Sequence, residues 1–376
     1  MKKILAICAS LLLTAGAMFA QELANFNFGG RGARVVSPEI QGDSVTFRLR
    51  ADYATMVRLS GSWMENPGAG EEMRRVANNV WEYKCPLPSP EIYTYNFIVD
   101  GVAVNDPLNI QVQRDGTRFL NMLIVPGKRT ENYGEANQRG TVKYMWYDSQ
   151  SLGLNRRMVV YTPYGYENNP KQKYPVLYLL HGGGGDEEAW TSMGRAAQIL
   201  DNLIEKGLAK PMIVVMPNGN PGQQAAATLN LPTKQATGQN AYVNSLVKEI
   251  IPFVEKNFRA IPNRSARAIA GLSMGGGHTL SATALYPGTF DYICPLSIGS
   301  QRSEQLDQQL QGIKKAGYKL YWFGCGESDF LWESAKQLDA ALTANGLEHT
   351  FFVTDGGHTW ANWRNYLNTF ARLLFK

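Results

Sequence analysis

The chain has 376 residues, of which 44% are hydrophobic and 18% are charged. This composition argues against a disordered or fibrous protein. The formal net charge of +5 is too small to indicate a surface built for nucleic acid. The length suggests two domains, or one large domain with an annex, and it allows a core that needs no disulfide support.

The first residues have the layout of a secretory signal peptide. Lys2 and Lys3 form a positive n-region, residues 4–13 form an apolar run, and small residues lead to Ala20. The apolar run is shorter than the roughly 20 residues that a membrane-spanning helix needs. We therefore expect residues 1–20 to be removed, and the mature protein to be exported to the periplasm or the medium without a membrane anchor.

The next part of the chain alternates with a period of two residues. Val45, Phe47 and Leu49 share one face of a strand, and residues 93–99 alternate in the same way before the turn signal Asp100-Gly101. Short strands without a helical stripe predict a small all-β sandwich over residues 21–126. The polar stretch 127–141 has no apolar period, and we expect it to be a linker.

From residue 142 to residue 376, apolar strands alternate with helical patterns. Between the strands expected at 212–216 and 266–270, apolar residues recur at three- and four-residue spacing from Val243 to Phe258, which predicts a helix. Strands joined by helices predict an α/β fold around a mostly parallel sheet, with ligand chemistry beyond the carboxyl ends of the strands. The remaining strands are expected at 175–180, 318–323 and 350–353.

The sharpest motif is the G-x-S-x-G stretch of residues 271–275, which places Ser273 between an apolar strand and a helix. A tight strand-to-helix turn needs small neighbours, and it lifts the serine hydroxyl clear of the sheet. We therefore interpret Ser273 as a nucleophile. A structural glycine turn is the alternative interpretation.

A serine hydroxyl needs a base, and the chain has only four histidines. The order serine, acid, histidine selects His358, which lies in a glycine loop after the last expected strand. The acid should lie between them at a strand end, and Asp329 fits this position because it follows the strand 318–323 through a short loop. Glu327 is the main alternative.

The glycine run 182–185 follows the strand 175–180. It lacks the spacing of a nucleotide-binding loop, but its backbone N–H groups suit an oxyanion hole. We expect the N–H groups of Gly183 and Met274 to be the donors. Histidines and carboxylates with metal-ligand spacing are absent from the sequence, so we expect neither a metal nor another cofactor.

On these motifs, the region from about residue 141 to residue 376 resembles the esterase-D-like α/β-hydrolases, especially carbohydrate esterase family one. The resemblance implies a feruloyl esterase or an acetylxylan esterase. The N-terminal part, with Trp63, Trp81 and Tyr93-Thr94-Tyr95, resembles the immunoglobulin-like accessory domains related to family 48 carbohydrate-binding modules. Both tryptophans fit a core position better than a stacking platform. The motifs that carry the first resemblance are Tyr161-Thr162-Pro163, Gly165-Tyr166, Leu180-His181-Gly182-Gly183, Pro217-Asn218-Gly219, the serine motif with Gly276, and Gly356-Gly357-His358 with Trp360.

The function implied by this resemblance is hydrolysis of esters on plant cell-wall polysaccharide. The expected partners are feruloylated or acetylated xylan and its oligosaccharides, not nucleic acid. A feruloyl group needs a cleft with aromatic walls, which Trp360 and Trp332 would provide. Feruloyl esterase is the leading hypothesis, and the alternatives are an acetylxylan esterase, a siderophore esterase and a catalytically silent glycan-binding protein.

Overall fold

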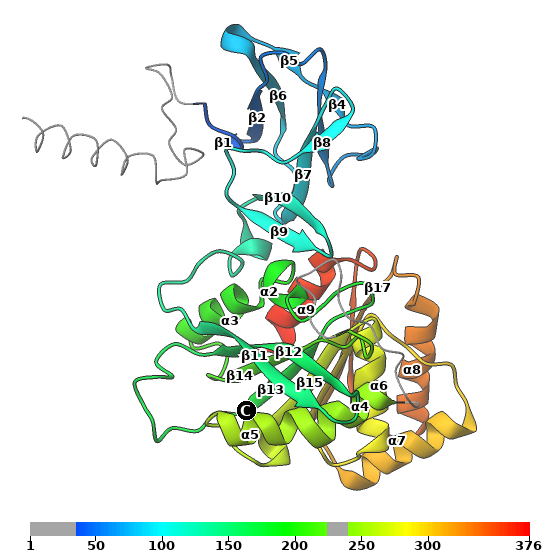
Figure 1. Ribbon diagram of the computed structural model, residues 1–376. Coiled ribbons are helices and arrows are strands. Elements are labelled where there is room, and N and C mark those ends of the chain that lie inside the picture. Colours follow the sequence, from blue (N-terminus) through cyan, green and yellow to red (C-terminus); the bar gives the residue numbers. More distant parts are fainter. Residues whose placement is uncertain (1–34, 224–239) are drawn as a thin grey trace, which may run out of the picture.

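The computed structural model describes residues 35–223 and 240–376, so the predicted signal peptide lies outside the described residues. An all-β part packs onto one end of a larger part with a central sheet (Figure 1). Within the described ranges, the helices are too short or too polar to cross a membrane.

The N-terminal part contains two antiparallel sheets, as the period-two pattern predicts. Val45, Phe47 and Leu49 are buried in the core between these sheets. Asp100 and Gly101 form the predicted turn, with positive φ angles of 48° and 88°. One sheet has the order β1 (Glu39–Gln41), β2 (Ser44–Arg50), β6 (Val80–Pro86), β5 (Arg74–Arg75). The other has the order β4 (Glu71–Glu72), β3 (Val57–Gly61), β7 (Ile92–Val99), β10 (Arg118–Ile124), β9 (Val112–Asp115), with β8 (Val102–Val104) paired to β7.

The two tryptophans of this part differ in burial. Trp81 is buried in the core, as expected. Trp63 is partly buried and packs against this core, where its ring stacks on Phe47 with 5.5 Å between centroids.

The segment expected to be a linker is packed instead of loose. It contains a short 3₁₀ turn, Lys128–Thr130, and Tyr133 is fully buried. Asn132 Nδ2 donates to Asn368 Oδ1 at 2.8 Å, and Arg195 Nε donates to the carbonyl of Tyr133 at 3.0 Å. The segment is attached to the larger part by hydrogen bonds more than by apolar side chains. Its sequence is therefore polar and shows no apolar period.

The larger part has a mostly parallel central sheet, as predicted. Strand β12 pairs antiparallel with both β11 and β14, and all later pairings are parallel. The antiparallel strands β11 and β12 were not among the predicted strands. In sheet order, the strands are β11 (Thr141–Ser149), β12 (Leu154–Thr162), β14 (Ile213–Pro217), β13 (Val176–Leu180), β15 (Arg267–Leu272), β16 (Tyr292–Leu296), β17 (Leu320–Gly326) and β18 (Thr350–Thr354).

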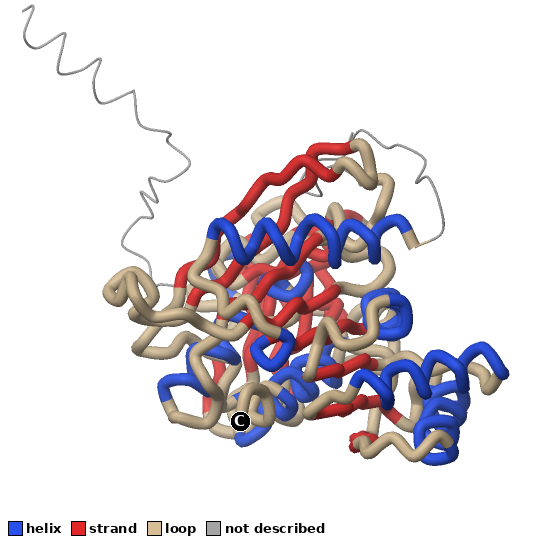
Figure 2. The backbone as a smooth tube through the Cα atoms, turned by 90° about the horizontal axis from the view of Figure 1, so that it is seen from below, coloured by secondary structure: helices blue, strands red, loops and turns tan. Residues whose placement is uncertain are grey.

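Helices cover both faces of this sheet (Figure 2). Helices α3 (Ala196–Glu205) and α9 (Trp360–Phe370) pack on one face, close to the short helix α2 (Ala189–Ser192). The other face carries α4 (Ala241–Ser245), α5 (Ile251–Asn257), α6 (Met274–Leu285), α7 (Glu304–Ala316) and α8 (Trp332–Ala344).

The helix predicted over residues 243–258 is present but interrupted. A π-helical turn, Leu246–Ile250, lies between α4 and α5. Pro252 follows this turn and has no N–H to donate. The missing donor accounts for the wider turn at this point, since helices relieve a broken hydrogen-bond ladder in this way.

A buried ion pair joins the two parts. Arg364 on α9 donates to Glu91 at 2.9 Å, and both side chains are less than a tenth exposed. Arg129 also pairs with Glu91, at 2.7 Å. The charges are therefore buried together where the N-terminal sheets meet α9.

We expect Glu91→Ala to lower the free energy of unfolding by about 3 kcal/mol, because it leaves the Arg364 guanidinium buried without its counter-charge. Urea denaturation measures this change. Glu71→Ala, at an exposed position of β4, is the control and should change stability by less than about 0.5 kcal/mol. Equal stability of both variants would contradict the role given to this pair.

Candidate active site

The turn at Ser273 has a strained backbone. Its φ of 52° and ψ of −115° lie in a region that residues with a side chain rarely adopt. The turn joins β15 to α6, and two hydrogen bonds hold it: Ser273 N–H donates to the carbonyl of Leu296, and Gly277 N–H donates to the carbonyl of Ser273, both at 2.9 Å. This geometry matches the strand-to-helix elbow that the G-x-S-x-G motif predicts.

The glycines near Ser273 lie where other atoms approach closely. A Cβ atom at Gly275 would lie 2.6 Å from the carbonyl oxygens of both Leu180 and His181. A Cβ atom at Gly182 would lie 2.4 Å from the Leu272 side chain and 3.3 Å from the Ser273 Cβ. The end of β13 and the glycine run after it therefore pass directly against the serine turn.

His358 is held by a buried carboxylate. Its Nδ1 lies 3.0 and 2.9 Å from the two carboxylate oxygens of Asp329. The Asp329 side chain is fully buried, whereas that of His358 is 19% exposed. Because Nδ1 faces Asp329, Nε2 is directed to the other side of the ring and is available to a proton donor.

The surroundings of Asp329 favour its ionised form. Burial alone would raise its pKa, but hydrogen bonds from His358, the Leu331 N–H and Ser297 outweigh burial and lower the pKa below its usual value. A carboxylate that stays ionised can hold the imidazole in one tautomer and stabilise its charged form.

The structure distinguishes Asp329 from the alternative acid. Glu327 is exposed, and its side chain makes no contact with His358 within the described residues. The same loop places Phe330 against the His358 ring, with 4.5 Å between centroids and 76% of the phenylalanine exposed. The sequence analysis did not single out Phe330, because an isolated aromatic residue in a loop carries no signal of its own.

The two expected oxyanion donors are close to Ser273: Met274 follows it in the chain, and Gly183 lines the same pocket. Met274 is the first residue of α6, where backbone N–H groups have no intrahelical partner. The N–H of Gly183 has no acceptor among residues 35–223 and 240–376, and a Cβ atom there would meet open space. Within the described residues, both N–H groups are therefore left without a backbone acceptor.

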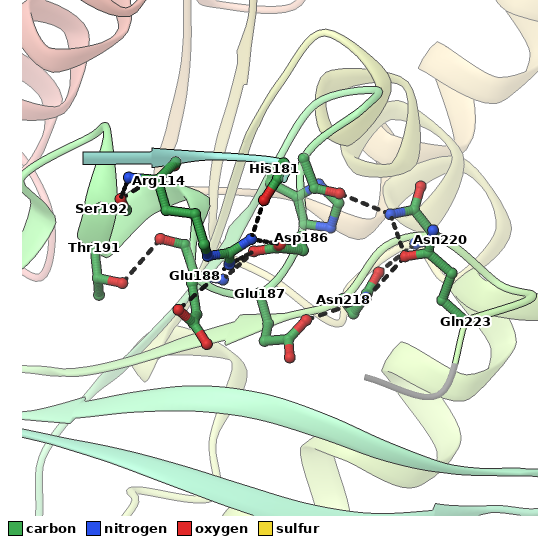
Figure 3. Close-up of polar contacts among 12 residues, drawn as sticks. Arg114, His181, Asp186, Glu187, Glu188, Thr191, Ser192, Asn218, Asn220 and Gln223 are labelled. Carbon is green, nitrogen blue, oxygen red and sulfur yellow. Dashed lines mark hydrogen bonds and ion pairs between the residues drawn. The ribbon is translucent and has the colours of Figure 1, made fainter. Parts of the chain in front are cut away.

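His181, at the start of the glycine run, is a structural residue (Figure 3). Gly219 N–H donates to its Nε2 at 2.8 Å, so Nδ1 carries the proton and donates to the carbonyl of Gly182, also at 2.8 Å. Burial lowers the pKa of His181 and keeps it neutral. Its ring therefore ties the glycine run to the loop after β14.

These residues open into one pocket of about 300 Å³. Ser273, His358 and the glycine run line it, together with Trp360. Asp115, at the end of β9, also lines it, so the N-terminal part contributes to the pocket. Sequence reasoning missed Asp115, because nothing in a strand pattern indicates which distant loop a strand end will meet.

Trp332 does not line this pocket. It begins α8 and packs against Phe351, with 5.6 Å between ring centroids. A helix start after the Asp329 loop directs it away from the serine, so the expectation that Trp332 forms a wall of the cleft is not supported by its position. Trp360, in contrast, does line the pocket and packs edge-on against Trp190 and Trp363.

A second pocket, of about 400 Å³, lies at the opposite edge of the sheet, where the parallel strands begin. Lys173, Lys210 and Lys319 line it, and no residue named above for the serine site does. Its larger volume does not make it the active site, since parallel sheets bind ligands beyond the carboxyl ends of their strands.

No group of three or more histidine, cysteine, aspartate or glutamate side chains placed to hold a metal ion is found in the described part of the chain. The free cysteines there, Cys85, Cys294 and Cys325, form no disulfide. The side chains of Ser273, His358 and Asp115 bring polar groups to the lining of the pocket.

Comparison with known proteins agrees with this geometry. The Esterase family model ("Putative esterase") matches residues 149–373, well over half of the chain. A protein of Xylanibacter ruminicola named endo-1,4-beta-xylanase/feruloyl esterase is 32% identical over 314 residues, which cover 82% of this chain and 42% of that protein. An esterase of Mycobacterium tuberculosis is 31% identical over 201 residues, which cover 53% of this chain and 40% of that protein. The chain therefore spans less than half the length of these two curated relatives.

Solved structures show the same fold. A ferulic acid esterase is 26% identical, with a TM-score of 0.54, and the match covers 63% of this chain and 98% of that one. The enterobactin esterase of Shigella flexneri has a TM-score of 0.61 at 18% identity, and the match covers 88% of this chain and 93% of that one. The second match extends over the N-terminal part as well.

The fold and the comparisons together define an esterase of the serine hydrolase type. The chain belongs to the Esterase family, whose model covers almost all of the part built on the central sheet.

We expect Asp329→Asn to lower kcat by about 10³–10⁴-fold, because an amide cannot hold His358 in the tautomer that leaves Nε2 as the base. Steady-state hydrolysis of an aryl acetate measures the effect. Glu327→Gln, in the same loop, is the matched control and should have wild-type activity. Loss of activity in the Glu327 variant with activity retained in the Asp329 variant would reverse the assignment of the acid.

His278, on α6 behind Ser273, gives a prediction for acid stability. Its ring packs on Tyr242, and burial, with a smaller effect of His181, lowers its pKa to about 4. The unfolded chain binds a proton at this residue near pH 6.5, so stability falls as the pH drops from about 6.5 to about 4, by up to roughly 3 kcal/mol.

Urea denaturation at several pH values, compared between the wild type and His278→Gln, measures this effect. The free energy of unfolding of the variant should depend less on pH than that of the wild type between pH 6.5 and 4, since the variant lacks the titrating group. Parallel pH profiles for the two proteins would show that His278 is not held neutral by folding.

Proposed function

We propose that the protein is a feruloyl esterase that releases hydroxycinnamate from feruloylated arabinoxylan. One observation carries this proposal: Ser273, on a strained turn, shares a pocket with His358, which the buried carboxylate of Asp329 holds from behind. The proposal is supported by the relative of Xylanibacter ruminicola and by the ferulic acid esterase structure.

In this mechanism, the Ser273 hydroxyl oxygen attacks the ester carbonyl carbon and its proton passes to His358 Nε2. Asp329 keeps the proton on Nδ1, so that Nε2 acts as the base. The N–H groups of Gly183 and Met274 bind the oxyanion, and each such donor contributes about 2.7–4 kcal/mol of transition-state stabilisation. The intermediate collapses with cleavage of its bond to the sugar oxygen, which takes the proton from His358 Nε2 and leaves as the free hydroxyl. Water then cleaves the acyl-enzyme by the same steps.

The lining of the pocket supports an aromatic acyl group. Trp360 and Met193 supply apolar surface in the pocket of Ser273. Phe330, outside this lining, presents an exposed ring against His358. A volume of about 300 Å³ suits an aromatic acid, whereas an acetyl group would leave most of it unfilled. Acetylated xylan is therefore the second choice among polysaccharide esters.

A siderophore esterase is the other candidate, because the enterobactin esterase structure matches this chain over both of its parts. That structure was determined with a dihydroxybenzoyl compound, which is also an aromatic acyl group. At 18% identity, this match carries the fold alone, and the xylanase/feruloyl esterase relative favours the cell-wall substrate.

We further propose that the N-terminal part is an immunoglobulin-like accessory domain of the type related to family 48 carbohydrate-binding modules, and that the protein is exported. The two facing antiparallel sheets support the first proposal. Contact of this domain with the substrate would occur through β9, whose Asp115 lines the pocket.

We expect the wild type to release ferulate from arabinoxylan and to hydrolyse methyl ferulate. Ser273→Ala should lower turnover by at least about 10⁴-fold with an almost unchanged melting temperature, since the nucleophile is lost while the fold is kept. Ferulate and acetate released from the same arabinoxylan are measured together by chromatography.

Each proposal can fail separately in this assay. Wild-type rates in Ser273→Ala would refute the nucleophile. Release of acetate without ferulate would make the protein an acetylxylan esterase, and hydrolysis of enterobactin without either product would favour the siderophore esterase. Folded protein that hydrolyses none of these esters would favour a silent glycan-binding protein.

A further inference from the structure

Arg114, on β9 of the N-terminal part, reaches across to the loop that follows the glycine run (Figure 3). Its guanidinium binds both carboxylate oxygens of Asp186, at 2.6 and 2.8 Å, and lies 3.3 Å from Glu188. The Arg114 and Asp186 side chains are 13% and 8% exposed, so this bidentate pair is shielded from water.

The backbone of Arg114 is attached to the same region. Its N–H donates to Ser192 Oγ at 2.7 Å, and this hydroxyl donates back to the Arg114 carbonyl at 3.1 Å. Because Ser192 lies on α2, immediately after the loop, strand β9 is fixed to the larger part at this position. The guanidinium is therefore held in register with the two carboxylates.

Asp186 in turn organises the end of the glycine run. Its Oδ1 accepts the Glu188 N–H at 2.8 Å, and its carbonyl accepts the Ala189 N–H at 3.1 Å. The carbonyl of Gly185 accepts a hydrogen bond from Asn220 at 2.8 Å. These bonds fix the chain where the four glycines end, as His181 fixes it where they begin.

The middle of the glycine run is held by one backbone hydrogen bond, from the Gly185 N–H to the carbonyl of Gly182 at 3.2 Å. Cβ atoms at Gly183 and Gly184 would meet nothing within 4 Å, so no side chain packs against the loop there. Glycine also lacks the steric limits that would restrict its backbone. The direction of the Gly183 N–H consequently depends on the anchors at the two ends of the run.

A second arginine shows that the anchoring has two sources. Arg157, on β12, pairs with Glu187 at 2.6 Å and also contacts Glu188. Asn218 donates to Glu187 at 3.0 Å. The central sheet thus holds Glu187, while Asp186 is held by an arginine that belongs to the N-terminal part.

We propose that Arg114 is a positioning residue for the oxyanion hole: through Asp186 it fixes the glycine run, so that the N-terminal part is needed to place the Gly183 N–H. This inference rests on the proposed role of Gly183. It predicts that the N-terminal part affects the chemical step even for a small ester that does not touch it.

The test compares Arg114→Ala, Arg114→Lys and Asp186→Asn in the full-length protein, with an aryl acetate as substrate. We expect kcat of Arg114→Ala to fall at least about tenfold, because small displacements of transition-state donors are costly, while KM stays unchanged. Arg114→Lys keeps the charge but not the bidentate geometry, so its kcat should lie between those of the wild type and Arg114→Ala. The double variant Arg114→Ala with Asp186→Asn should have nearly the same kcat as Arg114→Ala alone, since both changes remove the same ion pair.

Arg129→Ala is the matched control. Arg129 is another arginine paired with a carboxylate near the junction of the two parts, but it contacts Glu91 and the Ala361 carbonyl rather than the glycine run. The Arg129→Ala variant should have a lower melting temperature than the wild type but the same kcat. Added guanidinium should restore part of the kcat of Arg114→Ala, which a merely structural defect would not allow.

Three results would overturn the inference: wild-type kcat in folded Arg114→Ala, an equal loss of kcat in Arg129→Ala, or fully additive effects of the Arg114 and Asp186 changes. If Arg114→Ala does not fold, the Arg114→Lys and Asp186→Asn variants decide in the same way. Ser273→Ala, measured alongside, separates the two claims: its inactivity together with an unaffected Arg114→Ala would refute the inference and leave the proposed function standing.

Discussion

Two strands and a helix meet at Ser273, and the positive φ of this residue is the constraint around which the site is arranged. Such a backbone costs about 1–3 kcal/mol and persists only where its surroundings leave no alternative. Here the surroundings are the end of β13 and the first turn of α6, which approach so closely that Gly275 has no room for a side chain. The same approach brings the glycine run beside the serine. A single packing arrangement thus exposes the hydroxyl and sets the N–H groups next to it.

The second determinant of the site is the burial of charge in matched pairs. Asp329 is ionised and faces His358, Asp186 faces Arg114, and Glu91 faces Arg364. The last two pairs join residues that are far apart in the chain, and both cross from the N-terminal sheets to the part with the central sheet. The packed segment around Tyr133 closes the same junction. The pocket is consequently lined from both parts, with Asp115 on one side and Trp360 on the other.

The parts of this structure that sequence could predict are those with a local pattern. The strand–glycine–helix signature located Ser273, and chain order with strand ends led to His358 and Asp329. Asp329 and Glu327 are two residues apart, and only the fold shows which of them turns inward to the imidazole. The buried connection at Tyr133 was hidden because its contacts are hydrogen bonds to residues more than 60 positions away. The contacts of Arg114 and Asp115 also join residues far apart in the chain, so the sequence did not reveal them. Trp332 shows that an aromatic residue close to the Asp329 loop need not enter the pocket.

The proposed mechanism requires a nucleophilic Ser273 with an oxyanion donor on a loop that both parts of the chain anchor. A crystal structure of the wild type inactivated by an aryl phosphonate tests it most directly, since the adduct imitates the tetrahedral intermediate. The account predicts phosphorus bonded to Ser273 Oγ, with the phosphonyl oxygen about 2.7–3.1 Å from the N–H groups of Gly183 and Met274. An adduct on another residue, or a phosphonyl oxygen directed away from the glycine run, would contradict it.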